Sequence, residues 1–130
     1  MAIYGIGAFH QSDVSPQFIT NNLAGTGWDF SDAPELHKFI ASLKVGDILY
    51  IKAAPPSSSD IIVRGIGIIR DDILLTAATS NGLVEIGRNV DWKFTTQFRI
   101  PKPTEKNNVR NNTLYEEFHP DVQAQIIQRL

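Results

Sequence analysis

The chain has 130 residues, 42% of them hydrophobic, and a formal net charge of −2 at pH 7. This length and apolar content are typical of one domain with its own core, and we expect a single domain over residues 1–130. The sequence holds no cysteine, which excludes disulfides, thiol catalysis and cysteine-ligated zinc and favours a cytoplasmic protein. It also lacks an apolar run of about eighteen residues, so we expect no membrane-spanning helix.

Basic residues gather in one stretch of this slightly acidic chain. Residues 86–110 hold six basic and two acidic residues, a local net charge of +4 that leaves −6 on the rest. Such a segment predicts contacts with a nucleic-acid backbone or another anion, and the alternative is a solvated strand-and-loop surface. The candidates for backbone contacts are Arg88, Lys93, Arg99 and Arg110, and the stretch also holds Lys102 and Lys106.

The beginning of the chain predicts a strand followed by a short helix. Residues 2–9 alternate loosely between apolar and polar side chains, as a strand does. Ser15 followed by Pro16 is typical of a helix start, because serine can cap a helix and proline is tolerated in its first turn. We expect this helix to run through Leu23 and to end at the turn residues 25–27.

The next helix carries the clearest amphipathic pattern in the chain. Asp32 can cap it, and Glu35, three residues later, can complete a capping box. The apolar residues fall at helical spacing and predict one buried stripe, which consists of Leu36, Phe39, Ile40 and Leu43. His37 falls on the predicted polar side of this helix.

Strand patterns follow the second helix. A Gly46-Asp47 turn leads into a strand over residues 48–53, which ends on Lys52 and Ala53. The segment 55–60 is rich in proline and serine and predicts a loop before a strand over 61–70. Further segments are a turn at Asp71-Asp72, a short strand over 73–79, strand segments at 83–86 and 89–92, and an alternating strand over 93–100.

The last part of the chain predicts a loop and a terminal helix. Residues 104–112 are polar and loop-like, and His119-Pro120-Asp121 is a typical helix start. Taken together, the elements predict an α+β fold: a strongly bent antiparallel sheet or small β-barrel with two or three helices packed on it.

The sequence contains no strong catalytic motif. It has no phosphate-binding loop, no nucleophile elbow and no zinc-binding helix, so we expect neither an enzyme nor a cofactor. The three histidines, His10, His37 and His119, lie far apart in the sequence and do not predict a metal site.

A few residues are candidates for a binding site. Trp28, in a glycine-rich loop, can form one wall of an aromatic pocket or can plug the core. Lys52 can be a hydrogen-bond donor at a pocket rim or a charge on the outer surface. His10 lies in a polar cluster with Phe9 and Asp13 that can line a pocket mouth or be an exposed loop. The other tryptophan, Trp92, fits a strand pattern and is expected in the core.

Five short motifs occur in a recognisable order. They are the helix from Asp13 to Ile19, the Gly27-Trp28 loop, the strand from Gly46 to Lys52, the strand from Gly65 to Ile68 and the strand from Val90 to Trp92. This order resembles the PUA-like/EVE-like small domains, including those fused to McrB-type restriction GTPases in bacterial defence systems. The resemblance covers roughly residues 2–100, and residues 110–116 are similar to a recurring tail element.

The resemblance implies a bent barrel that recognises modified bases or RNA, often with a flipped base in an aromatic pocket. It implies that Trp28 is the wall of this pocket and Lys52 its rim donor, with Phe9, His10 and Asp13 nearby. We therefore expect a non-enzymatic module that binds a modified base in DNA or RNA, in a phage or in bacterial defence. The alternative is a protein-interaction subunit or a small-nucleotide binder. The chain carries no GTPase or nuclease domain, so we do not expect it to act alone as a restriction enzyme.

Overall fold

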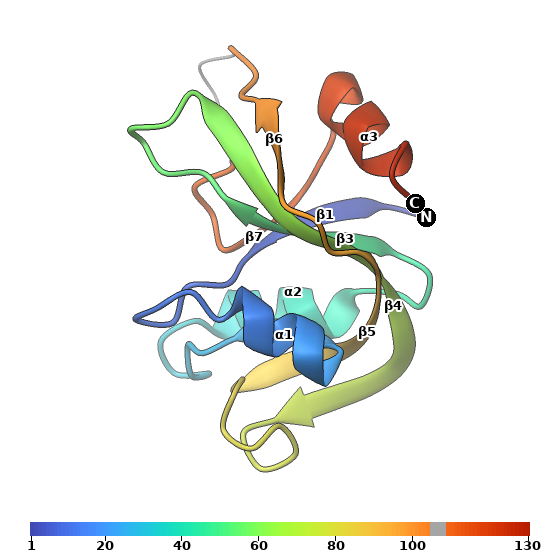
Figure 1. The fold of residues 1–130 in the computed structure, drawn as a ribbon. Coiled ribbons are helices and arrows are strands. Elements are labelled where there is room, and N and C mark those ends of the chain that lie inside the picture. The colour runs from blue at the N-terminus through green and yellow to red at the C-terminus, as the bar shows by residue number, and fades with distance from the viewer. Residues whose placement is uncertain (105–108) are drawn as a thin grey trace.

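The computed structural model describes residues 1–104 and 109–130, and within them the chain forms three helices and a strongly bent seven-stranded sheet (Figure 1). The predicted α+β class is therefore confirmed. Glu105 and Lys106 of the basic stretch lie outside the described residues. The elements in chain order are β1 (Ile3–Gly7), α1 (Ser15–Asn21), β2 (Leu23–Thr26), α2 (Pro34–Ser42), β3 (Ile48–Ala53), β4 (Asp60–Thr76), β5 (Ile86–Phe94), β6 (Phe98–Pro101), β7 (Leu114–Glu116) and α3 (Pro120–Ile127).

The sheet is mixed, whereas the sequence predicted an antiparallel one. Its strand order is β2-β5-β4-β3-β1-β7, and β6 pairs with β4 beside this path. β1 and β3 are parallel, with Ile3 opposite Ile48 and Gly7 opposite Lys52, and the other pairs are antiparallel. The parallel pair is possible because α1, β2 and α2 lie between the two strands in sequence and return the chain to the same end of the sheet.

The long strand β4 bends the sheet and joins two hydrophobic cores. The predicted turn at Asp71-Asp72 and the separate strand over 73–79 are wrong, because β4 continues to Thr76 with an irregular register between Ile69 and Leu74. Such a bulge keeps a strand paired while it changes direction. One core lies under α1 and α2 and includes Phe18, Ile40, Ile51, Ile69 and Val90; the other lies under α3 and includes Tyr50, Ile61, Ile66, Ile100 and Ile126.

The first helix is shorter than predicted. Asn22 takes a left-handed conformation with φ of 54° and ends α1, so that Leu23 begins strand β2. Gly25 and Thr26 therefore pair with β5 and do not form a turn. A side chain at Gly25 does not fit there, because a Cβ would lie 2.1 Å from the carbonyl oxygen of Ile86. Ser15 is not the cap, as the sequence predicted, but the first helical residue: Val14 is the N-cap and makes no side-chain capping bond. The Asp13 carboxylate accepts hydrogen bonds from the Ser15 N–H at 2.9 Å and the Ser15 hydroxyl at 2.5 Å.

The second helix has the predicted buried stripe but not the predicted cap. Ile40 and Leu43 are buried, and Leu36 and Phe39 pack against the same core, as expected. The capping box of Asp32 and Glu35 is wrong: Ala33 is the N-cap residue of α2, and it makes no side-chain capping bond. The carboxylate of Asp29 instead accepts a hydrogen bond from the Asp32 N–H at 3.2 Å, and this bond closes a turn in the loop before the helix.

The alternating stretch over residues 93–100 is not one strand. β5 ends at Phe94, and β6 begins at Phe98 and pairs with β4. The exposed residues 95–97 connect the two strands, and the apolar–polar alternation happens to continue across this connection. No helix among residues 1–104 and 109–130 has the length and apolar character that crossing a membrane requires.

Candidate ligand pocket

A cavity of about 470 Å³ opens where four separate segments of the chain meet. The end of β1 and the loop after it form one side, and the end of β2 with the following loop forms another. β3 contributes Lys52, and the segment before β7 closes the remaining side. The cavity, here called the pocket, is lined by Gly7, Phe9, His10, Gln11, Thr26, Gly27, Trp28, Lys52, Asn111 and Thr113.

Two exposed aromatic side chains flank the pocket. Trp28 is 58% exposed and Phe9 is 74% exposed, so the interpretation of Trp28 as a core plug is wrong. The backbone of Trp28 is nevertheless fixed, because its N–H donates to the Thr26 hydroxyl at 3.2 Å and its carbonyl lies 2.7 Å from Nε2 of His37. The backbone that carries the indole is therefore fixed beside the pocket, and the surface of the ring stays open to a ligand.

His37 anchors the loop that carries Trp28. The sequence placed it on the polar side of its helix, and this is wrong, because His37 is buried. The loop between β2 and α2 folds back over the helix, so that Phe30 packs edge-to-face on the His37 ring at 5.6 Å between centroids. The position of the pocket wall thus depends on a histidine that amphipathic spacing alone assigns to solvent.

His10 lines the pocket as a neutral side chain. Its ring packs edge-to-face on Phe18 at 5.7 Å and lies against Gly27, where a Cβ would be 3.2 Å from Nδ1 of His10. Burial lowers the pKa of the His10 imidazole, and a hydrogen bond with the backbone of Leu83 opposes this shift only in part. At neutral pH the ring is therefore uncharged and can serve as a planar contact surface.

Lys52 lies at the inner end of the pocket. Only 9% of the residue is exposed, and its Nζ donates a hydrogen bond to the carbonyl oxygen of Arg110 at 2.7 Å. The same ammonium group lies 5.6 Å from the centroid of the Tyr115 ring. Among the residues that the structure describes, Arg110 O is the only hydrogen-bond acceptor of Nζ. The ammonium group therefore keeps donor capacity for a ligand.

A buried polar network contacts Lys52 through Arg110 and Tyr115. The hydroxyls of Tyr50 and Tyr115 are 2.7 Å apart, and Tyr50 donates to the Glu117 carboxylate at 2.7 Å. Arg110 forms an ion pair with Glu117, and both side chains are buried. Burial raises the pKa of both tyrosines, so they remain protonated donors. Tyr115 fits its site only because Gly5 faces it, since a Cβ on Gly5 would lie 2.4 Å from the Tyr115 hydroxyl oxygen.

Asp13 does not join the expected pocket residues. Its carboxylate is engaged by Ser15 and lies 3.7 Å from Nε of Arg64, on a neighbouring surface. The structure thus brings Phe9, His10, Trp28 and Lys52 together and leaves Asp13 outside.

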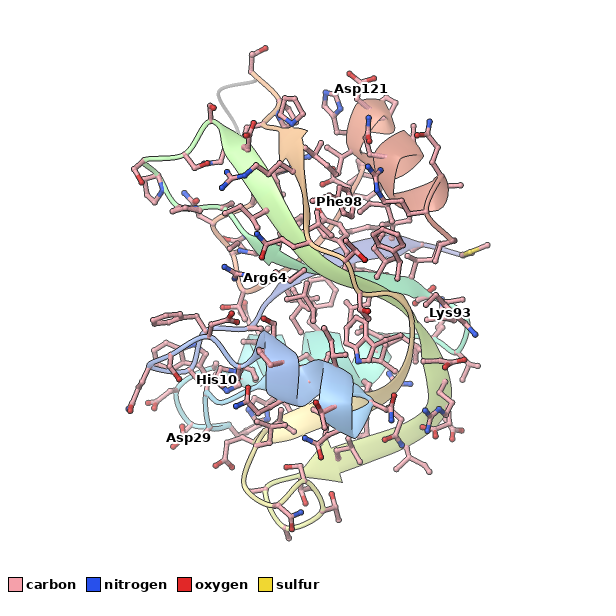
Figure 2. All side chains as sticks on the ribbon, in the orientation of Figure 1. His10, Asp29, Arg64, Lys93, Phe98 and Asp121 are labelled. Atoms are coloured by element: carbon pink, nitrogen blue, oxygen red, sulfur yellow. The ribbon has the colours of Figure 1, made fainter. Side chains whose placement is uncertain are left out.

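The four residues predicted to contact a nucleic-acid backbone, all of them in the described part of the chain, do not form one surface. Arg88 is buried and donates to the carbonyls of Ile40, Leu43 and Asp71, and Arg110 is buried in its ion pair, so the prediction of backbone contacts from these two residues is wrong. Lys93 pairs with Asp91 at 2.8 Å, and Arg99 lies 3.8 Å from Asp60. Figure 2 shows Lys93 on the opposite side of the molecule from His10.

Several pocket residues carried no signal of a binding site in the sequence. Asn111 and Thr113 belong to a polar segment without periodicity that stood out only as a tail element. Gly7 was expected in a strand and Thr26 in a turn. Trp92 is partly buried against the first core, and its Nε1 donates to the Phe18 carbonyl at 3.0 Å, as a core tryptophan does.

The buried ammonium group predicts a pH-dependent stability. Burial lowers the pKa of Lys52 from 10.5 to about 8, so the folded protein binds this proton more weakly than the unfolded chain does. Burying the charged lysine therefore lowers the free energy of unfolding by its full amount below pH 8. This free-energy cost is lost as the pH rises from 8 to 10.5. We expect the free energy of unfolding of the native protein to rise relative to that of Lys52→Met by about 1 kcal/mol between about pH 7.5 and 9.5.

Chemical denaturation of both proteins across this range measures the difference. Tyrosines and other groups titrate in both proteins, so their contributions cancel in the comparison. A difference in unfolding free energy that stays constant with pH would show that the folded lysine titrates at its ordinary pKa.

A scan of protein-family models gives no match to this chain, and a search of curated proteins finds no similar sequence. The likeness to PUA-like/EVE-like small domains therefore depends on the order of the short motifs alone.

Proposed function

We propose that this protein is a non-enzymatic recognition module that binds a nucleobase in the pocket, in particular a modified base of DNA or RNA. The observation that carries the proposal is the combination of two exposed aromatic rings, Trp28 and Phe9, with the buried donor Lys52 at the inner end of one cavity. Planar rings bind to exposed aromatic side chains by stacking, which contributes about 1–3 kcal/mol per base.

The polar groups of the pocket then fix the orientation of the ring. Lys52 donates at the inner end, and Asn111 and Thr113 are polar residues of the wall. A volume of about 470 Å³ is of the size that small-molecule sites have. A base extruded from a strand would enter with its ring leading and leave its sugar and phosphate at the mouth.

The biological setting follows from the resemblance and is part of the same proposal. PUA-like/EVE-like small domains occur in bacterial defence systems, and we propose a cytoplasmic role of this kind, in a phage or its host. The likeness also favours a reader over an enzyme.

A free nucleotide is the second candidate ligand. It is favoured by the arrangement of the basic residues, because Arg88 and Arg110 are used inside the fold and Lys93 lies far from the mouth. Binding of a single-stranded oligonucleotide that is tighter than binding of its mononucleotide, and that weakens with salt, supports a polymer ligand. Equal, salt-independent binding of both supports a free nucleotide.

The variant Trp28→Ala tests the proposal. We expect it to weaken binding of nucleosides at least tenfold, because the stacking surface is lost. Because Trp28 is 58% exposed, we expect its free energy of unfolding to change by less than about 0.5 kcal/mol. Isothermal titration calorimetry and urea denaturation measure the two quantities.

Phe118→Ala is the control for this variant. Phe118 is an exposed aromatic residue that does not line the pocket and lies outside the loop that carries Trp28. We expect Phe118→Ala to bind as the native protein does. Native affinity in Trp28→Ala, or equal losses in both variants, would contradict the proposed pocket.

A further inference from the structure

We propose that the pocket selects bases by their carbonyl edge. The ligand would be a keto base, of the uracil, thymine, hypoxanthine or guanine type, whose carbonyl oxygen accepts a hydrogen bond from Nζ of Lys52. A base that presents an exocyclic amino group at this edge would be rejected. This inference rests on the proposed function, since it assumes that a base enters the pocket.

The charge of the pocket supports this choice. Among the described residues that line it, Lys52 is the only charged side chain and no carboxylate is present. A methylated ammonium group or another cation would meet the Lys52 charge without compensation. The pocket therefore favours a neutral or anionic ring with an acceptor at its inner end.

The position of the Lys52 ammonium group is fixed before a ligand arrives. Arg110 O holds Nζ at 2.7 Å, and Tyr115 lies beneath it. Tyr115 is itself held by Tyr50, which is bonded to Glu117. A donor held in place in this way discriminates strongly, because a wrong edge leaves two buried donors facing each other, which costs about 1–3 kcal/mol.

Gly7 leaves the space beside the ammonium group open. A Cβ at this position would lie 3.8 Å from Cε and 3.9 Å from Nζ of Lys52, which is ordinary van der Waals contact. Gly7→Ala therefore fits the fold, and its methyl group would shield the donor from a ligand. This variant tests the inner end of the pocket without removing the lysine.

The experiment compares two matched pairs of nucleosides. Uridine and cytidine differ at one edge by a carbonyl against an amino group, and inosine and adenosine differ in the same way. Binding of all four is measured by calorimetry at pH 7 to the native protein, Lys52→Met, Gly7→Ala and Trp28→Ala. For the native protein we expect the keto member of at least one pair to bind at least about tenfold tighter.

In Lys52→Met and Gly7→Ala we expect this ratio to fall to within about twofold, while Trp28→Ala weakens both members of a pair. Equal binding of keto and amino bases to the native protein, or a preference for amino bases, would overturn the inference and leave base binding intact. A preference that persists in both Lys52→Met and Gly7→Ala would also overturn it. Absence of binding by all four nucleosides and by oligonucleotides would overturn the proposed function itself.

Discussion

Glu117→Gln is expected to lower the free energy of unfolding by about 3–5 kcal/mol, because it removes the buried carboxylate charge that pairs with the buried guanidinium of Arg110. Both side chains of this ion pair are buried, with exposed fractions of 8% and 1% for Arg110 and Glu117. The same carboxylate accepts hydrogen bonds from the Tyr50 hydroxyl at 2.7 Å and from the N–H of His119 at 3.0 Å. Urea denaturation followed by circular dichroism measures the change.

The neighbouring residue provides the control for this variant. Glu116 is partly exposed and is the last residue of strand β7, directly before Glu117. We expect Glu116→Gln to change the free energy of unfolding by less than about 0.5 kcal/mol. Similar losses in the two variants would show that the ion pair does not stabilise the fold.

A double variant separates the effect of removing one partner of the ion pair from the effect of removing both. Replacing both partners, as in Arg110→Met with Glu117→Leu, removes the two buried charges together, and such replacements are often close to neutral. We expect the double variant to be more stable than Glu117→Gln. A double variant that is less stable would show that the hydrogen bonds from Tyr50 and His119, and not the charge pair, dominate.

Arg88→Met is expected to lower the free energy of unfolding by about 3 kcal/mol, because several buried carbonyl oxygens lose their donor at once. The guanidinium group donates to Ile40 O at 3.2 Å, to Leu43 O and to Asp71 O at 2.7 Å. Two of these carbonyls lie at the end of α2 and the third lies in β4, so one side chain joins a helix end to the bend of the sheet.

Arg99→Met is the matched control for Arg88→Met. The side chain of Arg99 is 56% exposed, and its NH1 lies 3.8 Å from Asp60, which is the geometry of a weak surface pair. We expect it to change the free energy of unfolding by at most about 0.5 kcal/mol. Thermal and urea denaturation of the two variants in parallel measure the difference. An Arg88→Met protein as stable as Arg99→Met would contradict the role assigned to the buried arginine.

Local patterns in the sequence were informative where a single element decides the result. The stripe of Leu36, Phe39, Ile40 and Leu43 is visible because helical spacing places these residues on one face. Lys52 and Trp28 stood out because each interrupts the pattern around it. The α+β class followed from the same kind of information, since it requires only the types of the elements.

Contacts between residues far apart in the sequence could not be predicted from such local patterns. Arg88 reads as a surface charge, and its partners Ile40 and Leu43 are 48 and 45 residues away in sequence. The register irregularity that lets β4 pass through Asp71 depends on pairing with β5, which no local pattern reveals. Asn111 and Thr113 line the pocket only because β7 pairs with β1 and brings them there.

The parallel pairing of β1 and β3 has a consequence for how this scaffold can change. Antiparallel strands can be joined by a tight hairpin, but a parallel pair always needs a long crossing segment. Here that obligatory crossing carries the Gly27-Trp28 loop, whereas Lys52 and the network behind it belong to β3, β7 and the segments that flank β7. A loop of another length or sequence between β2 and α2 would therefore change the entrance of the pocket and the ring that it accepts. Lys52 and the residues that hold it would stay the same.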